Sequence, residues 1–145
     1  MSTTAVEKGL QFEKAIVDML KAGYDLWTNQ DVEGYLEVGK SDAERGDYFL
    51  RVVGDSMVGS HIYEDDLVFV QQCNSVNSGD IAIVMIDEEV TIKKVYFKND
   101  NLILVASNLK YDDRYFDQEE IERQNIQIIG KVLFVRRDFL MSQNN

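Results

Sequence analysis

A serine at a turn and a lysine in a strand pattern could together perform nucleophilic chemistry. Ser56 follows Gly54 and Asp55, directly after the apolar segment Tyr48–Val53. A serine hydroxyl is a poor nucleophile until a base removes its proton. Lys93 could be that base, because burial lowers a lysine pKa from its ordinary value of about 10.4 and leaves the amine neutral. The two residues therefore predict a serine–lysine dyad, although a turn serine and a structural, half-buried lysine would give the same pattern.

The strand pattern separates Lys93 from the lysine beside it. Residues 90–97 alternate in the manner of a strand, which places Lys93 on the same face as Val95 and Phe97. That face is expected to point toward the core, whereas Lys94 points to the opposite face. Lys94 is therefore the natural surface control for any experiment on Lys93.

Three motifs follow one another along the chain: Gly-Asp-Ser-Met at 54–57, Asp-Leu-Val at 66–68 and Val-Thr-Ile-Lys-Lys at 90–94. In this order they resemble the LexA-type serine–lysine autoprotease domain, a family that includes LexA and phage repressors and UmuD proteins. The similarity extends from about Lys21 to Leu140. It implies a mostly β fold of small twisted sheets with one N-terminal helix, and it implies no cofactor.

The resemblance also implies what the dyad cuts. Members of the family cleave one of their own peptide bonds upstream of the serine, and the matching bond here is Ala22-Gly23. A helix C-cap at Gly23 is the alternative interpretation of this small pair. Ser56 would attack in cis, and Lys93 would act as general base. The oxyanion would be held by backbone N–H groups around the turn, those of Asp55, Ser56 and Met57.

Composition excludes several other classes of protein. The chain has 145 residues, 45% of them hydrophobic and 28% charged, which indicates one ordinary soluble domain. Its net charge of −11 repels phosphate backbones, so we expect no direct DNA binding by this chain. No apolar run is long enough for a membrane helix. The single Cys73 and single His61 exclude an internal disulfide and a zinc site, so we expect a cytoplasmic protein without a metal.

The N-terminal segment is expected to differ from the rest of the chain. Thr4–Leu20 has a capping box and an apolar stripe, which predict a helix, so residues 1–21 are interpreted as a helical arm and 22–145 as the autoprotease and dimerisation domain. On the repressor pattern, a DNA-binding domain would precede this chain. On the UmuD pattern, Met1 would be the native start.

The rest of the sequence predicts strands separated by polar turns. The expected strands are Glu33–Val38, Tyr48–Val53, Leu67–Gln71, Asp80–Ile86, Glu89–Phe97, Leu102–Ala106 and Ile126–Val135. Gly39–Asp47 and Tyr111–Gln124 are expected to be polar loop and surface. Asp65 stands where the family has a glycine, so it should adopt left-handed geometry. Gly130 interrupts the last strand and predicts a bulge or a close backbone approach.

Two further positions bear on function. The chain contains no proline, so Ala106-Ser107-Asn108 replaces the family's Pro-x-Asn sequence and leaves the geometry of this loop open. His61 lies close to Ser56 in sequence, but no acidic residue that would orient it is identifiable, so it is expected at the surface. Cys73 is expected to be structural or incidental.

Partners follow from the resemblance alone. Family members dimerise through the last strand, which points to Val132, Phe134 and Phe139, although an ordinary core strand would show the same alternation. They are stimulated by the RecA filament on single-stranded DNA during the SOS response. The expected function is a self-cleaving repressor domain that forms a homodimer or higher oligomer. The alternatives are a UmuD-like polymerase accessory protein and a non-catalytic dimerisation module.

Overall fold

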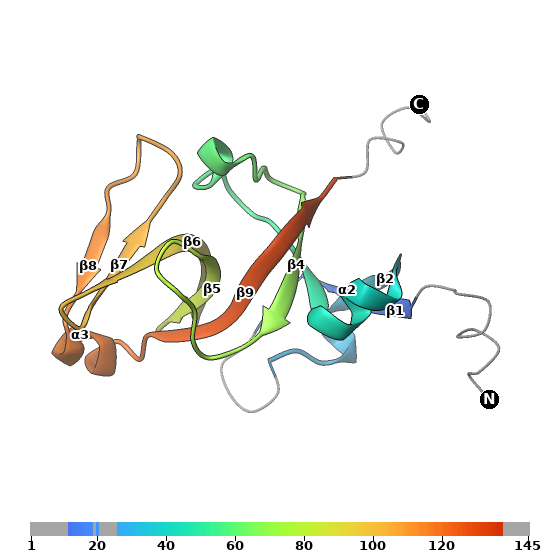
Figure 1. Ribbon diagram of the computed structural model, residues 1–145, viewed down its shortest axis with the longest axis horizontal. Helices are drawn as coiled ribbons and strands as arrows, with labels where there is room; N and C mark the ends of the chain where they lie inside the picture. Colours follow the sequence, from blue (N-terminus) through green and yellow to red (C-terminus); the bar gives the residue numbers. More distant parts are fainter. Residues whose placement is uncertain (1–11, 19, 21–25, 138–145) are drawn as a thin grey trace.

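The computed structural model describes residues 12–18, 20 and 26–137, and this part of the chain is mostly β (Figure 1). Within these described residues, nine strands form one sheet in the order β2-β1-β3-β4-β9-β5-β6-β7-β8. The strands are β1 Phe12–Val17, β2 Val32–Val38, β3 Tyr48–Arg51, β4 Leu67–Gln72, β5 Ile81–Ile86, β6 Glu89–Lys98, β7 Asn101–Val105, β8 Arg114–Phe116 and β9 Gln127–Arg136. The helices are α2 Lys40–Arg45, α3 Gln118–Arg123 and the 3-10 turns Asn29–Asp31 and Val58–Ser60. The β-rich fold class is therefore confirmed.

Strand β9 joins the two halves of the sheet. It pairs antiparallel with β4 along one edge and with β5 along the other. In Figure 1 it runs as a long diagonal between β1, β2 and α2 on one side and β6, β7, β8 and α3 on the other. Because both halves hydrogen-bond to the same strand, β9 fixes their relative position.

The backbone approaches closely at Gly130, as its position in the sequence predicts. The register of β9 against β5 shifts beside this residue, where the partners change from Ile83–Gly130 to Val84–Ile128. A Cβ atom built on Gly130 would lie 2.5 Å from Cγ1 of Val70, which is closer than side chains pack. Gly130 thus allows β4 and β5 to pack tightly on both sides of β9.

Among the described residues, the buried side chains form three core clusters. The largest contains Tyr48, Val70 and Ile83 and lies where the two halves meet, and a second contains Val95 and Leu104 beneath the β5–β8 hairpins. The third is aromatic, with the rings of Phe69 and Phe134 4.9 Å apart between centroids.

The residues predicted for a dimer seam are engaged within the chain. Val132 packs against the largest cluster and Phe134 against the aromatic one, so both help to hold β9 in its own domain. Their role between subunits stays a prediction. Phe139 lies outside the described residues.

Two local assignments from the sequence are wrong. Phe12–Val17 is strand β1 rather than part of a helix, because it pairs antiparallel with β2 and parallel with β3. Gly39–Asp47 contains helix α2 rather than only a loop. Tyr111–Gln124 is mostly exposed, as predicted, and also contains β8 and α3. Helix α3 begins with a capping box between Asp117 and Glu120.

Among the described residues, no helix is long and apolar enough to span a bilayer.

Gly130→Ala should destabilise the protein by roughly 1–3 kcal/mol, because the added methyl group overpacks the contact with Val70. Gly34→Ala is the matched control, since its Cβ would lie 3.9 Å from Ile16 in ordinary contact. Urea unfolding of both variants measures the difference. Equal stability of the two would contradict the close approach at Gly130.

Candidate active site

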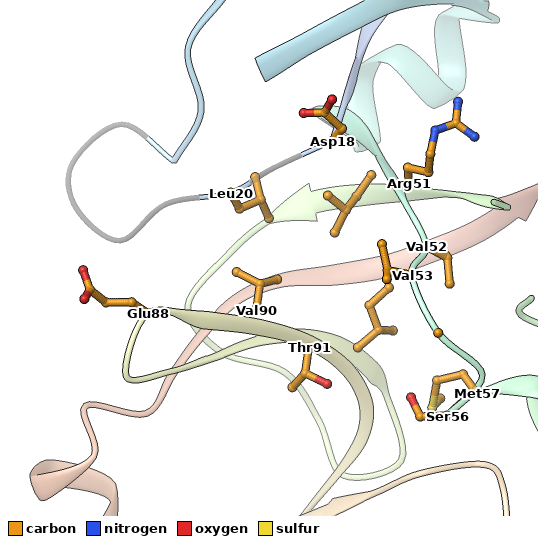
Figure 2. Close-up of a pocket in the computed structure, with 13 residues that line it drawn as sticks. Asp18, Leu20, Arg51, Val52, Val53, Ser56, Met57, Glu88, Val90 and Thr91 are labelled. Atoms are coloured by element: carbon orange, nitrogen blue, oxygen red, sulfur yellow. The ribbon is translucent and has the colours of Figure 1, made fainter. Parts of the chain in front are cut away.

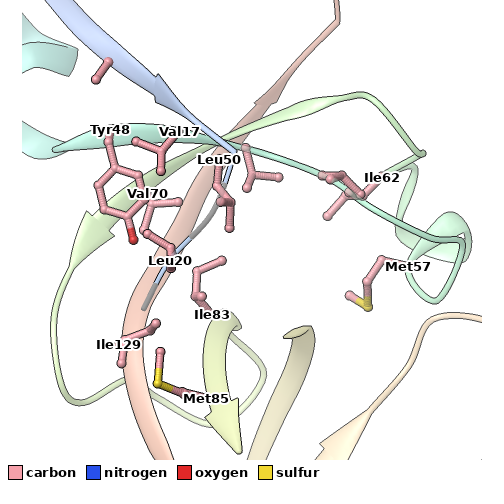
Figure 3. Close-up of a cluster of buried hydrophobic side chains, with 13 residues drawn as sticks. Val17, Leu20, Tyr48, Leu50, Met57, Ile62, Val70, Ile83, Met85 and Ile129 are labelled. Carbon is pink, nitrogen blue, oxygen red and sulfur yellow. The ribbon is translucent and has the colours of Figure 1, made fainter. Parts of the chain in front are cut away.

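Ser56 lies on a turn that is anchored in the core by the next residue. Strand β3 ends at Arg51, and the chain turns through Gly54 with a φ of 89°, which favours glycine. Met57 is only 2% exposed and belongs to the largest core cluster, and in Figure 3 its side chain points into the interior near Ile62. The buried methionine therefore leaves the Ser56 hydroxyl at the surface of a cleft.

Lys93 reaches Ser56 from strand β6. Its Nζ lies 3.1 Å from Ser56 Oγ, within hydrogen-bond distance. The same Nζ donates to Thr91 Oγ1 at 2.5 Å and to the carbonyl oxygen of Ile92 at 3.3 Å. Two of the three contacts thus come from β6 itself and orient the amine toward the serine. Thr91 is a functional contact that the sequence pattern alone does not single out, although it shares the face of Lys93 two residues away.

The surroundings of Lys93 favour the neutral amine. Burial lowers the pKa of Lys93, and the nearby positive charge of Arg114 lowers it further. The charged form would donate three hydrogen bonds, whereas a neutral amine offers a lone pair to the Ser56 proton. The contact between the two side chains can therefore run in the direction that general-base catalysis requires.

A second turn, at Tyr63–Asp66, hydrogen-bonds to the chain that leads into the Ser56 turn, because the Val52 amide donates to the Asp66 carbonyl oxygen at 2.8 Å. Asp66 is 2% exposed, and its carboxylate accepts from the Tyr63 amide at 2.8 Å and from Arg137 Nε at 2.6 Å. Burial alone would raise the pKa of Asp66, but these hydrogen bonds and the Arg137 charge hold the pKa below its ordinary value. Asp65 has a φ of 73°, as expected for a residue in the family's glycine position.

The loop between β7 and β8 binds the Ser56 turn through hydrogen bonds and an ion pair. Asn108 Nδ2 donates to the Asp55 carbonyl oxygen at 2.9 Å. The Asp55 carboxylate accepts from the Tyr111 hydroxyl and lies 2.6 Å from Lys110 Nζ. The structure thus defines the geometry of this loop, which no local sequence pattern predicts because the linked positions are far apart in the chain.

A cleft of about 660 Å³ opens beside the dyad. Its apolar lining includes Leu50, Val52 and Ile92, and Figure 2 shows Ser56 and Met57 toward one end with Leu20 toward the other. An extended, mostly apolar cleft next to a nucleophile suits a stretch of polypeptide. The predicted scissile pair, Ala22 and Gly23, lies outside the described residues.

The other reactive side chains lie apart from this arrangement. His61 is exposed, and its carbonyl oxygen accepts from Arg137. Cys73 is half-buried, and burial raises the pKa of its thiol. Within the described ranges, no group of three or more His, Cys, Asp or Glu side chains is placed to hold a metal ion.

Lys93→Met should increase the free energy of unfolding at neutral pH. The comparison is made in a Ser56→Ala background, which lacks the nucleophile and should not cleave itself. Below the lowered folded-state pKa of Lys93, the native state must carry a buried charge, and this cost disappears as pH rises toward about 10.4, the unfolded value. The gain should therefore shrink at alkaline pH in thermal unfolding. Lys94→Met controls for the loss of one positive charge. A variant less stable than its background at neutral pH would contradict the lowered pKa of Lys93.

Comparison with known proteins identifies relatives of this chain. The chain is 37% identical over 123 residues to the LexA repressor of Citrifermentans bemidjiense, covering 84% of this chain and 60% of that protein. It is 33% identical over 134 residues to the LexA repressor of Thermotoga petrophila, covering 91% of this chain and 66% of that protein. The chain thus spans about three fifths of the length of these relatives. The family profile described as Peptidase S24-like matches residues 15–133, and the chain belongs to that family.

Proposed function

We propose that this chain is the self-cleaving domain of a LexA-like repressor, with Ser56 as nucleophile and Lys93 as general base. The observation that supports this most directly is the 3.1 Å contact between Lys93 Nζ and Ser56 Oγ. The lowered pKa of Lys93 and the cleft beside the pair agree with it. Membership of the Peptidase S24-like family makes peptide-bond hydrolysis the relevant chemistry.

The proposed reaction cleaves the Ala22-Gly23 bond in two steps. The neutral Lys93 amine takes the Ser56 proton as Oγ attacks the Ala22 carbonyl carbon. The resulting lysine ammonium then protonates the Gly23 nitrogen, which leaves as the new amino terminus, and Ser56 remains esterified to Ala22. Water, deprotonated by Lys93, hydrolyses this ester and restores the serine. Backbone N–H groups of Asp55, Ser56 and Met57 are the proposed oxyanion donors.

We expect self-cleavage to be regulated, because it needs two states that are each rarely populated. Cleavage requires a neutral Lys93 and a substrate segment that occupies the cleft, so the intact protein should cleave itself only slowly at neutral pH. In the cell, the RecA filament on single-stranded DNA would favour the cleavable state during the SOS response. Because the substrate is tethered, no diffusing peptide and no cofactor is needed. The repressor would act as a homodimer.

Incubation at alkaline pH should split the purified protein after Ala22, because the neutral fraction of Lys93 rises with pH. Ser56→Ala and Lys93→Ala should each reduce the cleavage rate at least about 1,000-fold, whereas Lys94→Ala should cleave like the parent. Intact-mass spectrometry over a time course measures all four proteins. Normal cleavage by a folded Lys93→Ala variant would refute the assignment of the base.

RecA filament on single-stranded DNA should accelerate the same cleavage at neutral pH by at least roughly tenfold, since it shifts the population toward the cleavable state. Gel assays with filament, with RecA lacking DNA, and with filament plus Ser56→Ala provide the comparison. If the filament leaves the rate unchanged while alkaline cleavage persists, the dyad stands and the SOS role is wrong.

A further inference from the structure

Asn108 has both ends of its side-chain amide fixed by backbone groups. Its Nδ2 donates to the Asp55 carbonyl oxygen at 2.9 Å, and its Oδ1 accepts from the Lys110 amide at 3.1 Å. A carbonyl oxygen can only accept and a backbone N–H can only donate, so one orientation of the Asn108 amide satisfies both partners. The side chain therefore connects its own loop rigidly to the turn before the nucleophile.

The Asp55 carbonyl oxygen, which accepts from Asn108 at 2.9 Å and more weakly from the Val58 amide at 3.4 Å, determines where the Ser56 amide points. The peptide unit between Asp55 and Ser56 is planar, and in a trans peptide the C=O and N–H bonds point in opposite directions. No peptide bond in the described residues is cis. Fixing the Asp55 oxygen therefore fixes the direction of the Ser56 N–H, on the side of the peptide away from Asn108.

Other contacts keep the loop in place so that Asn108 can act on this peptide. The Gly59 amide donates to the Ser107 carbonyl oxygen at 2.6 Å, and a Cβ built on Gly59 would lie 2.5 Å from that oxygen. The Asp55 carboxylate is bound by Lys110 and Tyr111, which together lower its pKa and keep it charged. The backbone and the side chain of Asp55 are thus held by the same loop.

We propose that Asn108 is a positioning residue that orients the Ser56 N–H as an oxyanion donor, with the Asp55 contacts to Lys110 and Tyr111 securing its loop. The inference deepens the proposed self-cleavage and rests on it for its kinetic consequence. Asn108 does not touch the reacting atoms in this scheme. It acts through the planar peptide that precedes the nucleophile, so its loss should weaken stabilisation of the oxyanion and leave the base unaffected.

The kinetic test uses Asn108→Asp and Asn108→Ala. Asn108→Asp keeps an acceptor for the Lys110 amide and the shape of the side chain, but it replaces the donor to Asp55. Both variants should lower the maximal rate of alkaline self-cleavage by roughly 10- to 100-fold, because a misdirected donor loses most of its effect. In Asn108→Ala, which adds no charge, the pH midpoint of the rate should stay at the parent value, since it reports Lys93. Tyr111→Phe should give a smaller loss.

Asn101→Ala, an exposed asparagine on β7, is the matched control and should cleave like the parent. Thermal unfolding separates positioning from folding, because the proposal requires lower rates in fully folded protein. Parent-like rates in Asn108→Ala, a shifted pH midpoint in that variant, or a loss that only follows the unfolded fraction would each overturn it.

A second readout separates failure of this proposal from failure of the proposed function. In the Lys93→Ala background, the Ser56 amide resonance of 15N-labelled protein should shift on Asn108→Ala and stay in place on Asn101→Ala. If the unsubstituted protein never cleaves, the proposed function fails, yet the shift still tests the orientation of the amide. An unmoved Ser56 resonance would overturn the role of Asn108 whatever the kinetics.

Discussion

The chemistry of this fold depends on keeping one lysine amine partly out of water and beside one hydroxyl. Burial penalises the charged form of Lys93, and Arg114 adds a like charge, so both effects favour the neutral amine. A flexible lysine side chain could escape this penalty by turning to solvent. Strand β6 opposes that movement, because it pairs with β5 on one side and β7 on the other, and Thr91 and Ile92 hold the Nζ near Ser56.

The remaining architecture brings the two reactive groups together from distant parts of the chain. Ser56 and Lys93 are 37 positions apart, and the strands β3 and β6 that lead to them are separated in the sheet by β4, β9 and β5. The sheet therefore curves so that its two halves face one cleft. Met57 secures the nucleophile turn from the core side, and Asn108 secures it from the loop side. Core packing at Met57 and a loop hydrogen bond from Asn108 therefore fix the nucleophile turn from two sides.

The sequence predicted those features that depend on local patterns. Alternation identified β6 and placed Lys93 on the same face as the buried Val95, although Phe97, predicted for that face, is exposed. Asp65 has the positive φ expected at its turn, and Gly130 marked a close approach. The sequence did not predict the features that are determined by contacts between residues far apart in the chain. Phe12–Val17 has apolar residues that fit either a helix or a strand, and pairing with β2 and β3 selects the strand. Helix α2 has no buried residue, so its sequence has no apolar periodicity that would predict a helix. The Asn108–Asp55 contact spans 53 positions and has no local signal.

The protonation of Lys93 is the quantity that most directly tests this account. Side-chain NMR of the lysine Cε and Nζ resonances can follow it in Ser56→Ala protein, which should remain intact throughout a pH titration. The account predicts that Lys93 titrates below the ordinary lysine value of about 10.4, because burial disfavours its charged form. A Lys93 amine that titrates at or above that value would contradict the account, since it would not be available as a base.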